Sequence, residues 1–241
     1  MASGSRVPML RLLVLGVLVV AAAAWAQDGP PVSEKIAKTY GLDSFSQIEQ
    51  IRYTFSIPEL NLSRLWVWEP KTDQVTYEGQ DKAGNPVKLT YQRSELSSQT
   101  AVVKDEIDPA FINDQYWLLF PFHLVWDSSA KVEETGMHKL PLGKGSARRI
   151  VVTYPAEGYS PGDTWELFVG TDNRIREWVY HHGGNPAWTG VWSWEDYKKA
   201  GPLLVSLNHR GTGKDGKPVR VLLSDVAVKL AGGANTWLKA Q

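Results

Sequence analysis

The chain has 241 residues, no cysteine, and 26 basic against 26 acidic side chains. The absence of cysteine excludes disulfides, thiolate metal sites, a cysteine nucleophile and a lipidated N-terminal cysteine. The balanced charge argues against a nucleic-acid partner, because phosphate binding needs an excess of basic side chains on one face.

The first 26 residues have the three parts of a secretory signal peptide. Arg6 and Arg11 precede an apolar run over residues 12–24, and Ala24-Trp25-Ala26 is a small-x-small cleavage site. The apolar run is too short to span about 30 Å of hydrocarbon, and a polar, proline-containing stretch follows it at once. We therefore expect cleavage near Ala26, export without a transmembrane anchor, and a single domain over residues 27–241.

Strands dominate the predicted secondary structure. A short helix over residues 33–40, stopped by Gly41, comes first. From residue 50 onward the hydrophobic period is two, in short runs of β-branched and aromatic residues set between Gly, Pro, Asn and Asp. We predict an antiparallel meander with strands at residues 51–57, 62–68, 74–78, 87–92, 148–154, 165–169, 174–181, 188–195, 203–209 and 219–230.

The strongest helical signal lies between the fourth and fifth of these strands. Asp108 is the predicted N-cap, Pro109 takes the first helical position, and Phe120-Pro121 closes the helix. Apolar side chains occupy two neighbouring faces of this segment. Such a helix needs cover on more than one side, as a plug against a curved sheet has.

Tryptophans occur in pairs on two of the predicted strands. Trp66 and Trp68 share one face of their strand, and Trp192 and Trp194 share one face of theirs. Because residues 65 and 67 are also apolar, the first of these strands is apolar on both faces. Either the strands close around a packed aromatic core, or one face lines a cavity that a ligand or lid fills.

Other familiar signatures do not fit their usual roles. The G-x-G-x-x-G string at residues 211–216 is followed by Pro218 and a strand, whereas a dinucleotide site needs a helix there. His181 and His182 are adjacent on a strand and face opposite ways, so they do not share a metal ion. Ser193 lacks the flanking glycines of a nucleophile elbow. We expect no cofactor, no metal and no catalytic residue.

Four strings, taken together, resemble a known family. They are Trp-Glu-Pro-Lys-Thr at 68–72, the helical segment 111–122, Gly-Asp at 162–163 before a strand, and Trp-Glu-Asp-Tyr-Lys at 194–198 leading to Gly-Pro at 201–202. Their order resembles a family of exported bacterial proteins and, more remotely, the LolA/LolB-like superfamily of periplasmic lipoprotein carriers and sensors. The resemblance implies a periplasmic protein with an incomplete antiparallel β-barrel (a mainly β, α+β fold) around a few short helices, and an apolar concave face that takes acyl chains.

Two features depart from that superfamily. No cysteine follows the signal, so the chain is not an anchored receptor of the LolB kind. The arginine with which carriers hold their lid aligns equally with Arg52 and Arg64, and both remain open.

These observations lead to three functional hypotheses. The first is a binding or carrier protein for a lipid, a lipoprotein acyl chain or a similar apolar ligand, whose cavity must replace about 12 kcal/mol of bilayer burial for a sixteen-carbon chain. The second is a protein-interaction or envelope-sensor module with a filled aromatic core and a protein partner. The third is a hydrolase. The candidate residues of the apolar cavity are Phe55, Trp66, Trp68, Tyr77, Phe111, Trp178, Trp192 and Trp194.

Overall fold

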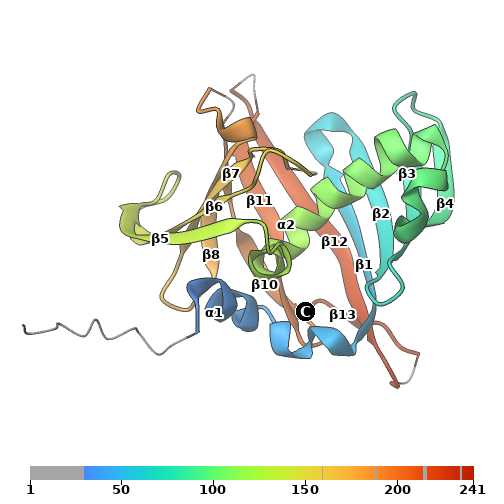
Figure 1. Ribbon diagram of the computed structural model, residues 1–241, viewed down its shortest axis with the longest axis horizontal. Helices are drawn as coiled ribbons and strands as arrows, with labels where there is room; N and C mark the ends of the chain where they lie inside the picture. The colour runs from blue at the N-terminus through green and yellow to red at the C-terminus, as the bar shows by residue number, and fades with distance from the viewer. Residues whose placement is uncertain (1–29, 159, 188, 214–215, 234) are drawn as a thin grey trace, which may run out of the picture.

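The computed structural model describes residues 30–158, 160–187, 189–213, 216–233 and 235–241 (Figure 1). The predicted signal peptide lies outside these residues. Two α-helices and five shorter helical segments accompany the strands of the described chain. They are α1 (Val32–Thr39), η1 (Leu42–Gln47), η2 (Pro58–Leu60), η3 (Arg93–Ser98), η4 (Val103–Ile107), α2 (Asp108–Trp126) and η5 (His182–Gly184).

The strands form one 13-stranded sheet in which every pairing found among the described residues is antiparallel. They are β1 (Ile48–Ile57), β2 (Leu62–Glu69), β3 (Gln74–Gln80), β4 (Pro86–Gln92), β5 (Lys131–Lys139), β6 (Ser146–Thr153), β7 (Thr164–Val169), β8 (Ile175–His181), β9 (Thr189–Ser193), β10 (Glu195–Ala200), β11 (Leu203–Thr212), β12 (Pro218–Leu230) and β13 (Leu238–Lys239).

The sheet is open. Its strand order is β4-β3-β2-β1-β12-β11-β9-β8-β7-β6-β5, with β10 added beside β11 and β13 beside β12, so β4 and β5 are its two ends. In the middle of the strand order, β1, the first long strand of the chain, pairs with β12, the last long strand. The predicted fold class, a curved antiparallel sheet forming an incomplete barrel around a few short helices, is confirmed.

Helix α2 crosses the inner side of this curved sheet and is buried on most of its circumference (Figure 1). On one side of α2, Phe111 packs against Trp66 and Trp68, with ring centroids 5.4 and 6.0 Å apart. On another side, Trp117 packs against the aromatic residues of β8 and β9. The helix therefore forms the centre of the core, as its two apolar faces predicted.

Two buried carboxylates tie α2 to the β1–β4 half of the sheet and the segment after it. Asp114 is fully buried and accepts hydrogen bonds from Arg64 Nη1 at 2.8 Å and Trp66 Nε1 at 2.9 Å, both on β2. Asp108, also fully buried, accepts from Arg93 Nε at 2.7 Å and the Tyr91 hydroxyl at 2.9 Å. Because an unpaired buried charge is costly, these contacts fix how far α2 lies along the sheet.

The predicted limits of this helix are wrong at both ends. Asp108 is not its N-cap: helical backbone already runs from residue 101, and the Thr100 hydroxyl accepts from the Val103 amide at 3.4 Å. The helix also continues through Pro121 to Trp126. Proline removes the amide that would bond the Trp117 carbonyl, and the buried His209 ring on β11 packs beside the Trp117 ring with centroids 5.3 Å apart.

The ten predicted strands are present with small shifts at their ends, and the structure adds β5 and β10, with β13 near the C-terminus. One predicted strand boundary, Trp188, lies outside the described residues. The segment around residues 211–216 connects two strands, as expected, although residues 214–215 lie outside the described chain. Within the described residues no helix is long and apolar enough to span a membrane.

We expect Arg64→Met to lower the free energy of unfolding at pH 7 by about 3–5 kcal/mol, because it leaves the Asp114 carboxylate buried without a counter-charge. Urea denaturation measures this. The matched control is Arg210→Met, which breaks the solvent-exposed pair with Glu195 and should leave the free energy of unfolding nearly unchanged. Equal losses in the two variants would contradict the anchoring role of Arg64.

The same carboxylate predicts a pH dependence. Burial, outweighing the attraction of Arg64, raises the pKa of Asp114 from 3.8 to about 6. Since the folded chain then holds this proton more tightly than the unfolded chain, the stabilising contribution is complete below pH 3.8 and is lost as the pH rises to about 6. The unfolding free energy of the wild type minus that of Asp114→Asn should therefore fall between about pH 4 and pH 7. A constant or rising difference would count against this assignment.

Candidate binding site

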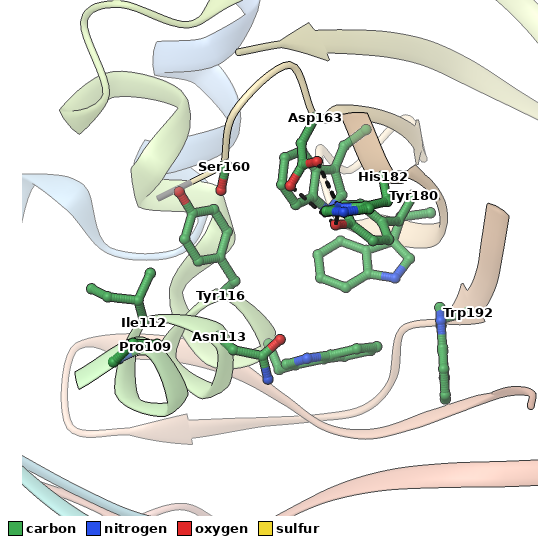
Figure 2. Close-up of a pocket in the computed structure, with 12 residues that line it drawn as sticks. Pro109, Ile112, Asn113, Tyr116, Ser160, Asp163, Tyr180, His182 and Trp192 are labelled. Atoms are coloured by element: carbon green, nitrogen blue, oxygen red, sulfur yellow. Dashed lines mark hydrogen bonds and ion pairs between the residues drawn. The ribbon is translucent and has the colours of Figure 1, made fainter. Parts of the chain in front are cut away.

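A cavity of about 230 Å³ lies between α2 and the β7–β9 part of the sheet (Figure 2). It continues into a wider groove of about 820 Å³, with which it shares Trp117, Tyr180, His182 and Trp192. The described residues that line the smaller space are Pro109, Ile112, Asn113, Tyr116, Trp117, Ser160, Asp163, Trp165, Trp178, Tyr180, His182 and Trp192.

Two cross-strand pairs supply most of the sheet side of the cavity. Trp178 on β8 lies directly opposite Trp192 on β9, and Tyr180 on β8 lies directly opposite Trp165 on β7. Since residues 178 and 180 are two apart on one strand, all four side chains project from the same face. The register of three neighbouring strands thus creates an aromatic wall.

The helix side of the cavity comes from the spacing of α2. Residues 109, 112, 113, 116 and 117 lie on adjoining rows of the helix, three or four positions apart. Trp117 stands at steep angles to both tryptophans of the wall: its ring centroid is 4.8 Å from that of Trp178 at 62° and 4.9 Å from that of Trp192 at 82°. The three rings therefore form a corner rather than a stack.

Tyr116 closes the cavity beside this corner. Its ring is stacked on Trp165 with centroids 5.6 Å apart and on His123 at 4.3 Å. Its hydroxyl donates to Asp127 Oδ2 at 3.2 Å, and the Tyr154 hydroxyl donates to the same oxygen at 2.6 Å. Burial raises the pKa of Tyr116 to about 12, so the phenol stays protonated. Burial alone would raise the pKa of Asp127, but hydrogen bonds from His123 and the two phenols outweigh it and lower that pKa.

The polar end of the cavity is built around Asp163. This carboxylate is only 5% exposed; it accepts from the Gly183 amide at 2.7 Å and the Tyr180 hydroxyl at 3.0 Å. His182 Nδ1 lies 3.2 Å from Asp163 Oδ1 and 2.9 Å from the Tyr180 hydroxyl (Figure 2). Burial raises the pKa of Tyr180, so this phenol also stays protonated as a donor. The contacts join the loop before β7 to η5 after β8.

The polar groups of the cavity do not form a serine-histidine pair. Ser160, Asp163 and His182 occur together here, but a serine nucleophile needs its hydroxyl against the imidazole. Figure 2 shows the Ser160 hydroxyl beside the Tyr116 phenol and apart from His182. Within the described chain no three His, Asp or Glu side chains are grouped so as to hold a metal ion. The cavity offers apolar walls and one fixed carboxylate.

The structure places the eight candidate residues in three different environments. Trp178 and Trp192 line the cavity. Trp194 is buried behind it, 5.2 Å from Trp178 and 4.7 Å from His209 between ring centroids. The other five residues lie in the packed core, on the side of α2 that faces away from the cavity. They are Phe55, Trp66, Trp68, Tyr77 and Phe111.

Several lining residues were not among the sequence candidates. Trp165 and Tyr180 lie on predicted strands, and the two-residue spacing of Tyr180 from Trp178 was a readable signal. Tyr116 and Trp117 lie on the predicted helix, but which side of it faces a cavity is decided by the sheet around it. Asp163 lies in the Gly-Asp string that contributed to the family resemblance.

Three solved structures are similar to this chain in fold. One is a DUF1329 family protein from Desulfovibrio piger, 7% identical with a TM-score of 0.43, over 84% of this chain and 93% of that one. A putative outer membrane lipoprotein-sorting protein domain from Vibrio parahaemolyticus is 10% identical with a TM-score of 0.41, over 84% and 95% of the two chains. The Mycobacterium tuberculosis lipoprotein LppX is 9% identical with a TM-score of 0.32, over 85% and 98%.

No protein-family model matches the sequence, and no curated protein does. No family or role follows from the similarity to the three solved structures, whose TM-scores are all below 0.5.

We expect Asp163→Ala to loosen the polar end of the cavity, because it removes the acceptor of the Gly183 amide and of the Tyr180 hydroxyl. The loss of unfolding free energy should be about 1–3 kcal/mol. Hydrogen exchange should show faster exchange of the Gly183 amide. Asp172→Ala, which removes an exposed carboxylate from the β7–β8 turn, is the control and should leave that amide protected. Unchanged exchange at Gly183 in Asp163→Ala would refute the role assigned to this carboxylate.

Proposed function

We propose that this chain is an exported, periplasmic binding or carrier protein for a lipid, a lipoprotein acyl chain or a similar apolar ligand, and that it is not an enzyme. The observation that supports this most directly is the aromatic cavity between α2 and β7–β9, with its continuation into an open groove. Ligand sites are typically concave, mostly apolar and preformed, with a few placed polar groups. The cavity has each of these properties.

The position of the open space favours binding on one side of α2. Between α2 and β1–β3 the aromatic side chains fill the core: Trp66, for example, contacts Tyr77 and Phe111 at centroid distances of 4.5 and 5.4 Å. A sensor or interaction module with a filled core would show such packing throughout. On the β7–β9 side the side chains leave a cavity instead, so we assign the ligand to that side, with Trp178 and Trp192 as wall residues.

The dimensions suit an amphiphile or a short apolar group better than a whole buried lipid. The volume of the cavity, about 230 Å³, is just below the usual range of about 300–1,000 Å³ for ligand pockets. The volume of the groove, about 820 Å³, lies within that range. Each CH₂ group buried there gains about 0.8 kcal/mol. A ligand with its head in the cavity and its chain in the groove uses both spaces.

The neutral fluorescent probe N-phenyl-1-naphthylamine should bind saturably, with an increase in its emission. Trp192→Ala should weaken this binding about tenfold, because it removes a wall shared by the cavity and the groove. The control is Trp237→Ala, since Trp237 packs against Arg52 and Lys229 outside the lining of either space and should leave the affinity unchanged.

Mass spectrometry of organic extracts from protein purified out of its native compartment complements this titration by identifying a bound lipid. If the wild type binds no probe saturably, or if Trp192→Ala binds as tightly as the wild type, the proposed site is wrong. The filled-core interaction module then becomes the better hypothesis.

A further inference from the structure

The walls of the cavity present aromatic faces from several directions. Six of the described lining residues are tryptophan or tyrosine: Tyr116, Trp117, Trp165, Trp178, Tyr180 and Trp192. Their rings are not all parallel to one another; Trp117 meets Trp178 at 62° and Trp192 at 82°. Each ring face carries partial negative charge, so a cation enclosed by several faces is attracted by all of them.

The cavity also holds a formal negative charge. Among the described residues that line it, Asp163 is the one carboxylate, and none is lysine or arginine. Two contacts of the Asp163 carboxylate, the Gly183 amide and the Tyr180 hydroxyl, are neutral donors. Another of these contacts is His182 Nδ1, which lies 3.2 Å from Asp163 Oδ1. The described lining therefore offers this carboxylate no lysine or arginine as a counter-charge.

We propose that the cavity binds a methylated ammonium group, with the aromatic walls around its methyl groups and Asp163 as its counter-charge. This inference rests on the proposed function, since it names the chemical class of the ligand head in the same site. A purely apolar group would gain the same burial but would make no electrostatic contact with the Asp163 carboxylate. An anionic head would be repelled by that carboxylate and by the ring faces.

Two sources share this chemistry: a free small cation and the headgroup of a lipid. The groove that continues from the cavity is lined mostly by aromatic and small residues, with Thr189 and Thr212 among them, and is open enough to take a chain attached to the ammonium group. A lipid would therefore occupy both spaces and a free cation the cavity alone.

Calorimetric titration of the full chain from residue 27 onward with a matched pair of probes tests the proposal. Choline carries a trimethylammonium group, and 3,3-dimethylbutan-1-ol has the same shape with a neutral tert-butyl group in its place. Choline should bind at least about tenfold more tightly than the alcohol, because only the cation gains from the rings and the carboxylate. Equal or weaker binding of choline would overturn the proposal.

Two variants test separately whether the carboxylate and the aromatic rings cause the preference for choline over the alcohol. Asp163→Asn keeps the shape of the side chain and one acceptor oxygen but removes the negative charge, and Trp192→Leu keeps an apolar wall without the ring face. Each should reduce choline affinity about tenfold and leave binding of the alcohol within about twofold. Asp225→Asn is the matched control, since Asp225 is exposed on β12 with φ of 52°, a conformation that asparagine tolerates. A choline affinity that survives both cavity substitutions would overturn the assignment.

Dodecylphosphocholine, used below its micellar concentration, shows whether the ligand is a lipid headgroup or a free small cation. Tighter binding than choline indicates a lipid headgroup with its chain in the groove, and equal binding indicates a free small cation. Failure of this inference is distinct from failure of the proposed function. If N-phenyl-1-naphthylamine binds and choline shows no preference, the site is apolar but not cation-selective, whereas if neither binds, both proposals fail.

Discussion

The architecture depends on the enclosure of one helix that is apolar almost all the way round. In α2 most side chains from residue 111 to residue 124 are buried, so no single face can be left to solvent. A flat sheet covers only one side of such a helix; a curved, incomplete barrel covers several. The acidic side chains Asp108, Asp114 and Asp127 then fix the helix in place, because each finds its hydrogen-bond donors on other elements or on the adjoining turn of α2.

The same helix divides the interior into a filled part and a partly open part. Phe111 and its neighbours on one side meet the aromatic residues of β2 and β3 at packing distance. Tyr116 and Trp117 on the other side meet the wall made by β7–β9, where rings at steep angles leave space between them. Both sides use the same residue types, so residue type alone does not decide which side is filled.

That division explains which parts of the structure can be predicted from the sequence. Strict alternation predicts most strands, and it assigns each of the two tryptophan pairs, at 66 and 68 and at 192 and 194, to a shared face. The strands β5 and β10 escape prediction because their side chains are largely exposed and polar, which leaves no apolar alternation to read. A local rule ends the helix at Pro121 because it takes no account of the tertiary packing that buries Phe122 and Leu124 in the last turn.

The cavity stays open because two of its phenols are held by carboxylates. Tyr116 donates to Asp127 and Tyr180 donates to Asp163, and swinging either ring into the empty space would leave a buried carboxylate short of a donor. The two acids therefore oppose collapse of the space that the apolar walls would otherwise fill. Asp163 differs from Asp127 in lining the cavity itself. Asp163, which holds Tyr180, thus also places a carboxylate at the cavity wall, and for that reason the proposed ligand is distinguished by its charge as well as by its size.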